Sequence, residues 1–210
     1  MEKQGGYDPL AKYYDRLARL VFGQAMVRSQ TFFLDWIPAG SRILILGGGT
    51  GWWLRQLLQS CPDGRILYID ASVKMLTLAR EVVNNDPRIT FIHGTHEVIA
   101  EVNAFDTIIT FYFLDLFSQQ DLGKLVKMIS VSAKPNALWL VTDFVKTRKW
   151  HALLLRVMYI FFRLTTGLHN QKLPDWEKAL MPEGISLLAQ KMFYGEFIKA
   201  GAYKVTKQAL

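Results

Sequence analysis

A short apolar run that ends in a cluster of glycines constrains the fold of this chain more than any other feature. The run ILIL at 43–46 is followed by GGGTG at 47–51 and then by an apolar helical pattern. Glycine permits positive φ and lets a ligand approach the main chain, and a helix that begins beyond it presents unpaired N–H groups. The pattern predicts a strand, a tight turn and a helix start, across which a nucleoside cofactor can lie.

An acidic residue stands where such a site needs one. A glycine loop alone is also a common strand-to-helix turn, but Asp70 ends the second apolar run about 20 residues further on, a place from which a carboxylate accepts hydrogen bonds from ribose hydroxyls. NAD-type loops follow the pattern GxGxxG, whereas Trp52 stands three positions after Gly49 and the last glycine is Gly51. Dinucleotide binding is therefore the weaker interpretation.

Apolar runs alternate with helical patterns along the chain, which favours an α/β fold with helices on both faces of a mostly parallel sheet. Ser72 and Ser118 stand where helix N-caps belong. The expected strands are 42–46, 65–69, 88–92, 105–111 and 137–142, with a sixth near 187–193. The expected helices between them are 52–60, 72–85 and 119–132. We predict a Rossmann-like, doubly wound sheet of seven strands.

The chain is long enough for one substantial core, and we expect a single domain over residues 1–210. Residues 1–40 are expected to form a helical cover and 41–144 the cofactor-binding core. Residues 145–210 are expected to supply substrate-side helices and an antiparallel hairpin that turns at Tyr194-Gly195.

Composition points to a cytoplasmic protein. The chain has one cysteine, Cys61, its amino terminus lacks the apolar stretch of a signal peptide, and no apolar stretch approaches the roughly 20 residues that span a bilayer. The formal net charge of +7 is uneven, because the segment from Phe144 to Pro174 contains six Lys and Arg residues and no Asp or Glu.

Three segments together resemble a known family. ILILGGGTG, YIDASVKMLTLAR and FDTIITFYFLDLF look like the cofactor-binding core of class I S-adenosylmethionine-dependent methyltransferases, and most like the ubiquinone/menaquinone-biosynthesis type. The resemblance covers roughly Tyr7 to Phe144 and includes YDPLAKYYDRLA, which is similar to the helix that those enzymes fold over the cofactor. It implies S-adenosyl-L-methionine as cofactor and S-adenosyl-L-homocysteine as product.

The resemblance also implies roles for the residues of the glycine loop and the second strand. Gly47, Gly49 and Gly51 would line the methionine and ribose parts of the cofactor. Asp70 would bind both ribose hydroxyls, and Ala71 would lie near the adenine edge.

Other implied contacts come from the following loops. Tyr112 and Phe113 would flank the methionine moiety, and Tyr14 would reach its carboxylate. Thr95 occupies the place of an Asp that holds the adenine amino group in the family, and Ile45 replaces an acidic residue of the first strand. Both departures remove an acidic contact, so a cofactor-binding protein without transferase activity is one alternative.

Methyl transfer from a sulfonium needs mainly positioning and, for a hydroxyl or amine, a base. Candidate bases near the carboxyl ends of the strands are Asp115 and His151, and further candidates are Asp143, His96 and His169. Each also has a structural explanation, as a cap, a strand end or a loop residue. No metal is expected, because scattered His and one Cys lack zinc-ligand spacing.

The acceptor is expected to be a small apolar or amphipathic molecule. Base-amino methyltransferases carry (D/N)PP(Y/F) after the fourth strand, and the TFYF at 110–113 does not match, so a nucleic-acid partner is the less favoured alternative. In the helical stretch 146–168, Lys149, Arg156 and Arg163 form a cationic stripe on a helix that is otherwise largely apolar. This helix would cover the acceptor, contact an anionic membrane surface, or simply pack on the sheet. The sequence predicts no oligomeric state.

Overall fold

The computed structural model describes residues 21–166 and 172–206, with backbone only for residues 159–166. Within these ranges the chain forms one seven-stranded sheet in the order β3-β2-β1-β4-β5-β7-β6. Strands β1 to β5 pair in parallel, whereas β7 runs antiparallel to both β5 and β6. This is a Rossmann-like, mostly parallel sheet with an antiparallel hairpin at its carboxyl-terminal end, so the predicted fold class is confirmed.

The strand bounds agree closely with the apolar runs. The strands are β1 Arg42–Leu46, β2 Arg65–Asp70, β3 Ile89–His93, β4 Phe105–Phe111, β5 Ala133–Phe144, β6 Ile185–Phe193 and β7 Ile198–Val205. The bounds predicted for the strands 42–46 and 105–111 are confirmed. The strand expected at 137–142 is longer at both ends. Ala133 pairs with Phe105 of β4 at its start, and Phe144 pairs with Ile198 of β7 at its end.

Serine caps begin two of the helices, as predicted. The Ser72 hydroxyl accepts the amide of Met75 before α4, and the Ser118 hydroxyl accepts the amide of Asp121 before α5. The helices are α2 Ala25–Thr31, α3 Leu54–Ser60, α4 Val73–Val82, α5 Gln119–Ser132, α6 Lys149–Thr166 and α7 Trp176–Leu180. Helix α3 begins two residues later than predicted, since positive φ at Gly51 extends the preceding turn.

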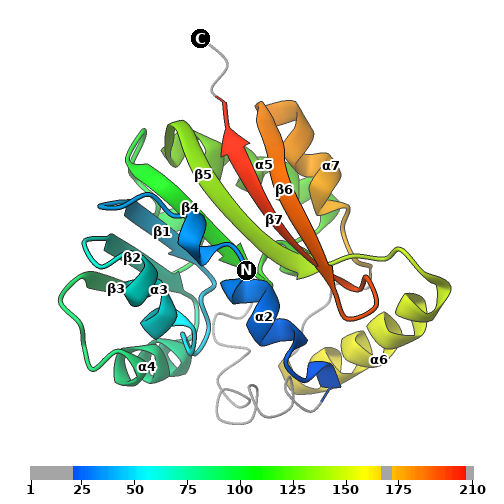
Figure 1. Cartoon of the computed structure of the whole chain (residues 1–210). Helices are drawn as coiled ribbons and strands as arrows, with labels where there is room; N and C mark the ends of the chain where they lie inside the picture. Colours follow the sequence, from blue (N-terminus) through cyan, green and yellow to red (C-terminus); the bar gives the residue numbers. More distant parts are fainter. Residues whose placement is uncertain (1–20, 167–171, 207–210) are drawn as a thin grey trace.

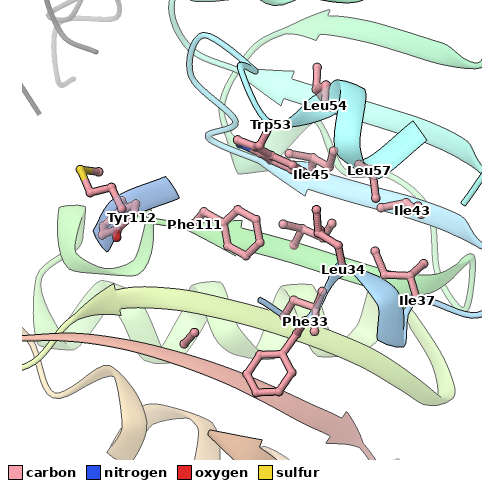
Figure 2. Close-up of a cluster of buried hydrophobic side chains, with 14 of the residues drawn as sticks. Phe33, Leu34, Ile37, Ile43, Ile45, Trp53, Leu54, Leu57, Phe111 and Tyr112 are labelled. Atoms are coloured by element: carbon pink, nitrogen blue, oxygen red, sulfur yellow. The ribbon is translucent and has the colours of Figure 1, made fainter. Parts of the chain in front are cut away.

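Both faces of the sheet are covered (Figure 1). Helices α2, α3 and α4 pack on one face, and α5 and α7 pack on the other. Figure 2 shows the hydrophobic core on the face that α2, α3 and α4 cover. There Trp53, at the start of α3, meets Phe111 of β4 edge to face, and Leu34 packs in the same cluster. The carboxyl ends of the parallel strands thus meet at one edge, where open α/β sheets bind ligands.

Of the segment 1–40, which the sequence predicts to be a helical cover, residues 21–40 are described. Helix α2 is fixed to the sheet near the carboxyl ends of two strands, because the Ser29 hydroxyl bonds with that of Tyr112 at 2.8 Å and its carbonyl accepts the Thr142 hydroxyl. Residues 1–20 lie outside the described residues. No helix within the described ranges has both the length and the apolar character to cross a membrane.

Candidate functional site

The glycine loop after β1 has the backbone that its sequence predicts. Gly47, Gly49 and Gly51 have φ of +62°, +64° and +65°, values that side-chain-bearing residues rarely adopt. The amide of Gly47 donates to the carbonyl of Ile69, so the turn starts as a continuation of the β1–β2 ladder. The loop is therefore held against the carboxyl end of β2.

The three glycines differ in what surrounds them. A Cβ at Gly47 would lie 2.3 Å from the Phe113 ring, and one at Gly51 would lie 2.7 Å from Leu54. A Cβ at Gly49 would meet no described atom within 4 Å. Gly47 and Gly51 thus allow close packing inside the protein, whereas the Cβ direction of Gly49 is open with respect to the described residues.

Asp70 holds the main chain of Gly49. One of its carboxylate oxygens accepts the Gly49 amide at 2.8 Å, and the other accepts the Ser72 amide at 2.9 Å. The side chain is buried, and main-chain donors from both loops orient it. Because a carboxylate offers about four acceptor positions, an oriented Asp70 suits the recognition of paired hydroxyls.

Tyr68 supports the loop from below and was missed from the sequence. Its hydroxyl donates to the Gly49 carbonyl at 2.8 Å, and a Cβ at Gly48 would lie 2.2 Å from its ring. Tyr68 lies two residues before Asp70, so both side chains project from the same face of β2. The period of two along this strand was the signal that could have identified it.

The loop after β3 lies next to this site. The Ala71 carbonyl oxygen lies 3.1 Å from Nε2 of the His93 ring, within hydrogen-bond distance. The Gly94 amide donates to the Asp70 carbonyl. The Thr95 hydroxyl caps the short turn that follows, accepting the Glu97 amide at 3.3 Å. Thr95 therefore stands beside β2 but offers a hydroxyl where the family often has a carboxylate.

Tyr112 and Phe113 leave the end of β4 in different directions. Tyr112 has φ of +52°, and its ring packs on Phe144 while its hydroxyl contacts Ser29. Phe113 instead lies against Gly47 and meets Phe117 edge to face at 5.1 Å. Phe113 thus packs directly on the glycine loop.

Three rings contact one another in sequence beside the glycine loop: those of Phe113, Phe117 and His96, together called the aromatic wall here. The His96 ring lies 5.2 Å from that of Phe117. Partial burial lowers the pKa of His96 below its usual value, so this ring is neutral at physiological pH. The structure thus joins the loops after β3 and β4 by apolar rather than charged contacts.

Asp115, just after β4, and Asp143, near the end of β5, form a buried carboxyl pair. Asp143, at the end of β5, accepts the amides of Leu114, Asp115 and Phe144. Its side chain also lies in hydrogen-bond contact with that of Asp115, whose Oδ1 is buried and has no partner among the described residues. Removal from water raises the pKa of Asp115 to about 7, and burial together with the Asp115 charge raises the pKa of Asp143 as well. The pair is arranged to hold a proton near neutral pH.

This pair makes stability depend on pH. Between about pH 4 and pH 7 the folded protein keeps protons on Asp115 and Asp143 that the unfolded chain releases, so the free energy of unfolding falls as pH rises, by up to about 1.4 kcal/mol per pH unit for each retained proton. Asp115→Asn removes one of the two like charges. We expect its melting temperature to exceed that of the native protein at pH 8 and to vary less from pH 4 to pH 8 by calorimetry.

Asp63→Asn, on the surface, is the control for this measurement and should leave the pH dependence of the native protein unchanged. Parallel melting curves for native protein and Asp115→Asn would contradict a raised pKa at Asp115.

His151 is fully buried at the start of α6. Its Nδ1 accepts the amides of Thr147 and Arg148 at 3.1 and 3.2 Å, and Nε2 lies 3.1 Å from the Gly195 carbonyl, to which it can donate. Both ring nitrogens are thus engaged by main-chain groups of the β5–α6 loop and the hairpin turn. These contacts favour an anchoring role for His151, whereas Asp115 keeps a buried oxygen without a described partner.

Three further residues singled out from the sequence are Tyr14, His169 and Ile45. Tyr14 and His169 lie outside the described residues. Ile45, on β1, is buried among apolar neighbours on the face of the sheet that α3 and α4 cover. Within the described ranges, no three His, Cys, Asp or Glu residues are grouped so that they could hold a metal ion.

Comparison with known proteins matches the central segment of the chain to a domain family. A family model described as a methyltransferase domain matches residues 43–136. Over 109 residues the chain is 32% identical to the malonyl-[acyl-carrier protein] O-methyltransferase of Halalkalibacterium halodurans, covering 49% of this chain and 38% of that protein. The chain therefore aligns with well under two thirds of this relative.

Solved structures share the fold at low sequence identity. A chain of the complex between the Haloferax volcanii Trm112 methyltransferase activator and a candidate methyltransferase matches 98% of this chain over 97% of its own length, at a TM-score of 0.75 and 14% identity. An S-adenosylmethionine-dependent methyltransferase from Aquifex aeolicus matches 93% over 97%, at a TM-score of 0.65 and 18% identity.

The comparisons do not single out the ubiquinone/menaquinone-biosynthesis type, which stays a prediction. Residues 43–136 of this chain match the methyltransferase domain family, and the described chain has the Rossmann-like methyltransferase fold.

Proposed function

We propose that this protein transfers the methyl group of S-adenosylmethionine to a small apolar or amphipathic acceptor. The observation that carries the proposal is the pairing of Asp70 with Gly49, a glycine of positive φ whose Cβ direction is open. The match of residues 43–136 to a methyltransferase domain supports it independently.

The residues of the loop fit this cofactor. Asp70 would hold the ribose hydroxyls, and Gly49 leaves room for a nucleoside that a larger residue would fill. Ala71 and Thr95 would border the adenine, and the Phe113 ring the methionine side. When bound, the cofactor supplies an electrophilic methyl group. Tyr112 and Tyr14 remain further hypotheses for its methionine end.

Asp115 is the proposed proton acceptor. Its pKa of about 7 leaves a useful fraction deprotonated at neutral pH, and its Oδ1 is not engaged by any described partner. Asp143 would orient Asp115 through the main-chain amides of the turn that carries it. His151 is the weaker choice, because main-chain groups occupy both of its ring nitrogens.

The acceptor class follows from the wall beside the loop. Phe113, Phe117 and His96 present rings rather than charges, which favours an apolar or amphipathic molecule. The relative that methylates malonyl-[acyl-carrier protein] at oxygen makes an oxygen of an acyl group one candidate. Nitrogen and carbon acceptors stay open.

Calorimetric titration tests the cofactor. S-adenosylmethionine and S-adenosylhomocysteine are expected to bind and to raise the melting temperature, whereas NAD is not. Asp70→Asn should weaken binding of both sulfur nucleosides by roughly 1–3 kcal/mol, because a neutral amide replaces charge-assisted bonds. Micromolar binding of NAD, with no binding of either sulfur nucleoside at millimolar concentration, would overturn the proposal.

Two alternatives have distinct outcomes. Binding of S-adenosylmethionine without turnover on a broad acceptor panel would indicate a cofactor-binding protein, as the Ile45 and Thr95 departures would allow. Retention on RNA that falls steeply with salt would indicate a nucleic-acid methyltransferase.

A further inference from the structure

Helix α6 is attached to the sheet by one side only. It follows β5 and lies beside the turn between β6 and β7 (Figure 1). His151 and Leu155, four residues apart, are buried, and the His151 ring packs 5.1 Å from that of Phe197. The salt bridge between Arg148 and Glu196 adds a second link to the turn. These contacts fix which side of the helix faces outward.

The outward side carries a strip of large apolar residues. Leu153 and Val157 are 68% and 58% exposed, and Trp150 beside them is 43% exposed although one side of its ring contacts the rings of Tyr194 and Phe197. At about 100° per residue their positions span only about 60° of the helix circumference, so they form a single strip. Apolar side chains gathered in this way, rather than scattered, mark an interaction surface.

Cations lie immediately beside this strip. Lys149 and Arg156 are exposed, and their seven-residue spacing places both along the edge of the strip that Leu153 forms. Lys146, just before the helix, is exposed as well. The segment from Phe144 to Pro174 has no acidic residue, and Glu196 of the neighbouring turn pairs with Arg148 rather than with Lys149 or Arg156.

We propose that the outward side of α6 docks on an anionic lipid surface. Leu153, Val157 and Trp150 would enter the boundary between headgroups and acyl chains, and Lys149 and Arg156 would extend to lipid phosphates. An apolar strip flanked along its length by long cations matches that boundary. A nucleic-acid backbone would use the cations but leave Leu153 and Val157 in water.

Co-sedimentation of the whole chain with lipid vesicles tests this surface. We expect the protein to bind vesicles of phosphatidylcholine that contain about 30% phosphatidylglycerol by mole, and to bind phosphatidylcholine alone much more weakly. Binding to the anionic vesicles should decrease as the salt concentration rises. Lys149→Gln/Arg156→Gln should lower the partition coefficient about fivefold per charge removed. Leu153→Ser/Val157→Ser should lower it further, with an unchanged melting temperature because both positions are exposed.

The control variant lies on α5, on the opposite face of the sheet. Lys127→Gln/Val131→Ser removes one exposed cation and one exposed apolar residue there and should bind vesicles like the native protein. Absence of native binding to anionic vesicles, or equal effects of the α5 and α6 variants, would overturn the proposal.

Two other occupants of this surface give different results, and either contradicts lipid docking. RNA retention lost in Lys149→Gln/Arg156→Gln but kept in Leu153→Ser/Val157→Ser, without vesicle binding, indicates a nucleic acid. A dimer in sedimentation velocity that Leu153→Ser/Val157→Ser dissociates, again without vesicle binding, indicates a second copy of this chain.

Discussion

Gly49→Val is expected to weaken S-adenosylmethionine binding by roughly 100-fold or more, about 2.7 kcal/mol. The open space beside Gly49 is where the proposed cofactor lies, and a branched side chain would fill it. The same change forces a β-branched residue to a φ of +64°, which would also cost roughly 1–2 kcal/mol of folding stability. Calorimetric titration measures the affinity, and thermal unfolding measures the folding cost.

Gly40→Val separates the two effects. Gly40 has φ of +68° and no described atom within 4 Å of a Cβ, as at Gly49, but it precedes β1 at the amino end of the sheet. It should lose similar folding stability and keep its cofactor affinity. If both variants bind S-adenosylmethionine equally well, the space beside Gly49 is not the cofactor site.

Asp143→Ala is expected to lower the free energy of unfolding by about 3–5 kcal/mol. The change leaves the buried amides of Leu114, Asp115 and Phe144 without their acceptor, and each unpaired buried donor costs roughly 1–3 kcal/mol. Relief of the repulsion between the two carboxyls offsets part of this cost. Urea unfolding measures the difference.

Asp63→Ala, at an exposed position, provides the comparison and should change stability by less than about 0.5 kcal/mol. Equal stabilities of the Asp143 and Asp63 variants would show that the amides at the end of β4 find other acceptors, and that Asp143 does not hold the turn carrying Asp115.

Local chemistry explains why most elements were predictable. The apolar run of β1 lies between Ser41 and Gly47, and the caps at Ser72 and Ser118 satisfy helix amides three residues on. The hairpin turn at Tyr194-Gly195 was predicted from its sequence, and both residues take positive φ. The longer β5 was missed because the pairing of Ala133 with Phe105 joins residues far apart in the chain.

The candidate bases show the limit of such reasoning. Asp115 and His151 were equivalent in the sequence, as polar residues after parallel strands. In the structure His151 is enclosed by main-chain groups of two loops, while Asp115 meets the carboxyl of Asp143, 28 residues later. Neither environment leaves a signal at the residue itself, because each depends on how separate loops pack.

The sequence by itself determined the order and type of the elements, the positive-φ loop at 47–51 and the carboxylate at the end of β2. Each of these depends on residues within one strand, turn or cap. Only the tertiary structure decided that Gly47 packs on Phe113 while Gly49 stays open, and that Leu153 and Val157 face outward on α6. The physical reason is that burial and contact belong to pairs of distant segments, whereas periodicity and capping belong to neighbours along the chain.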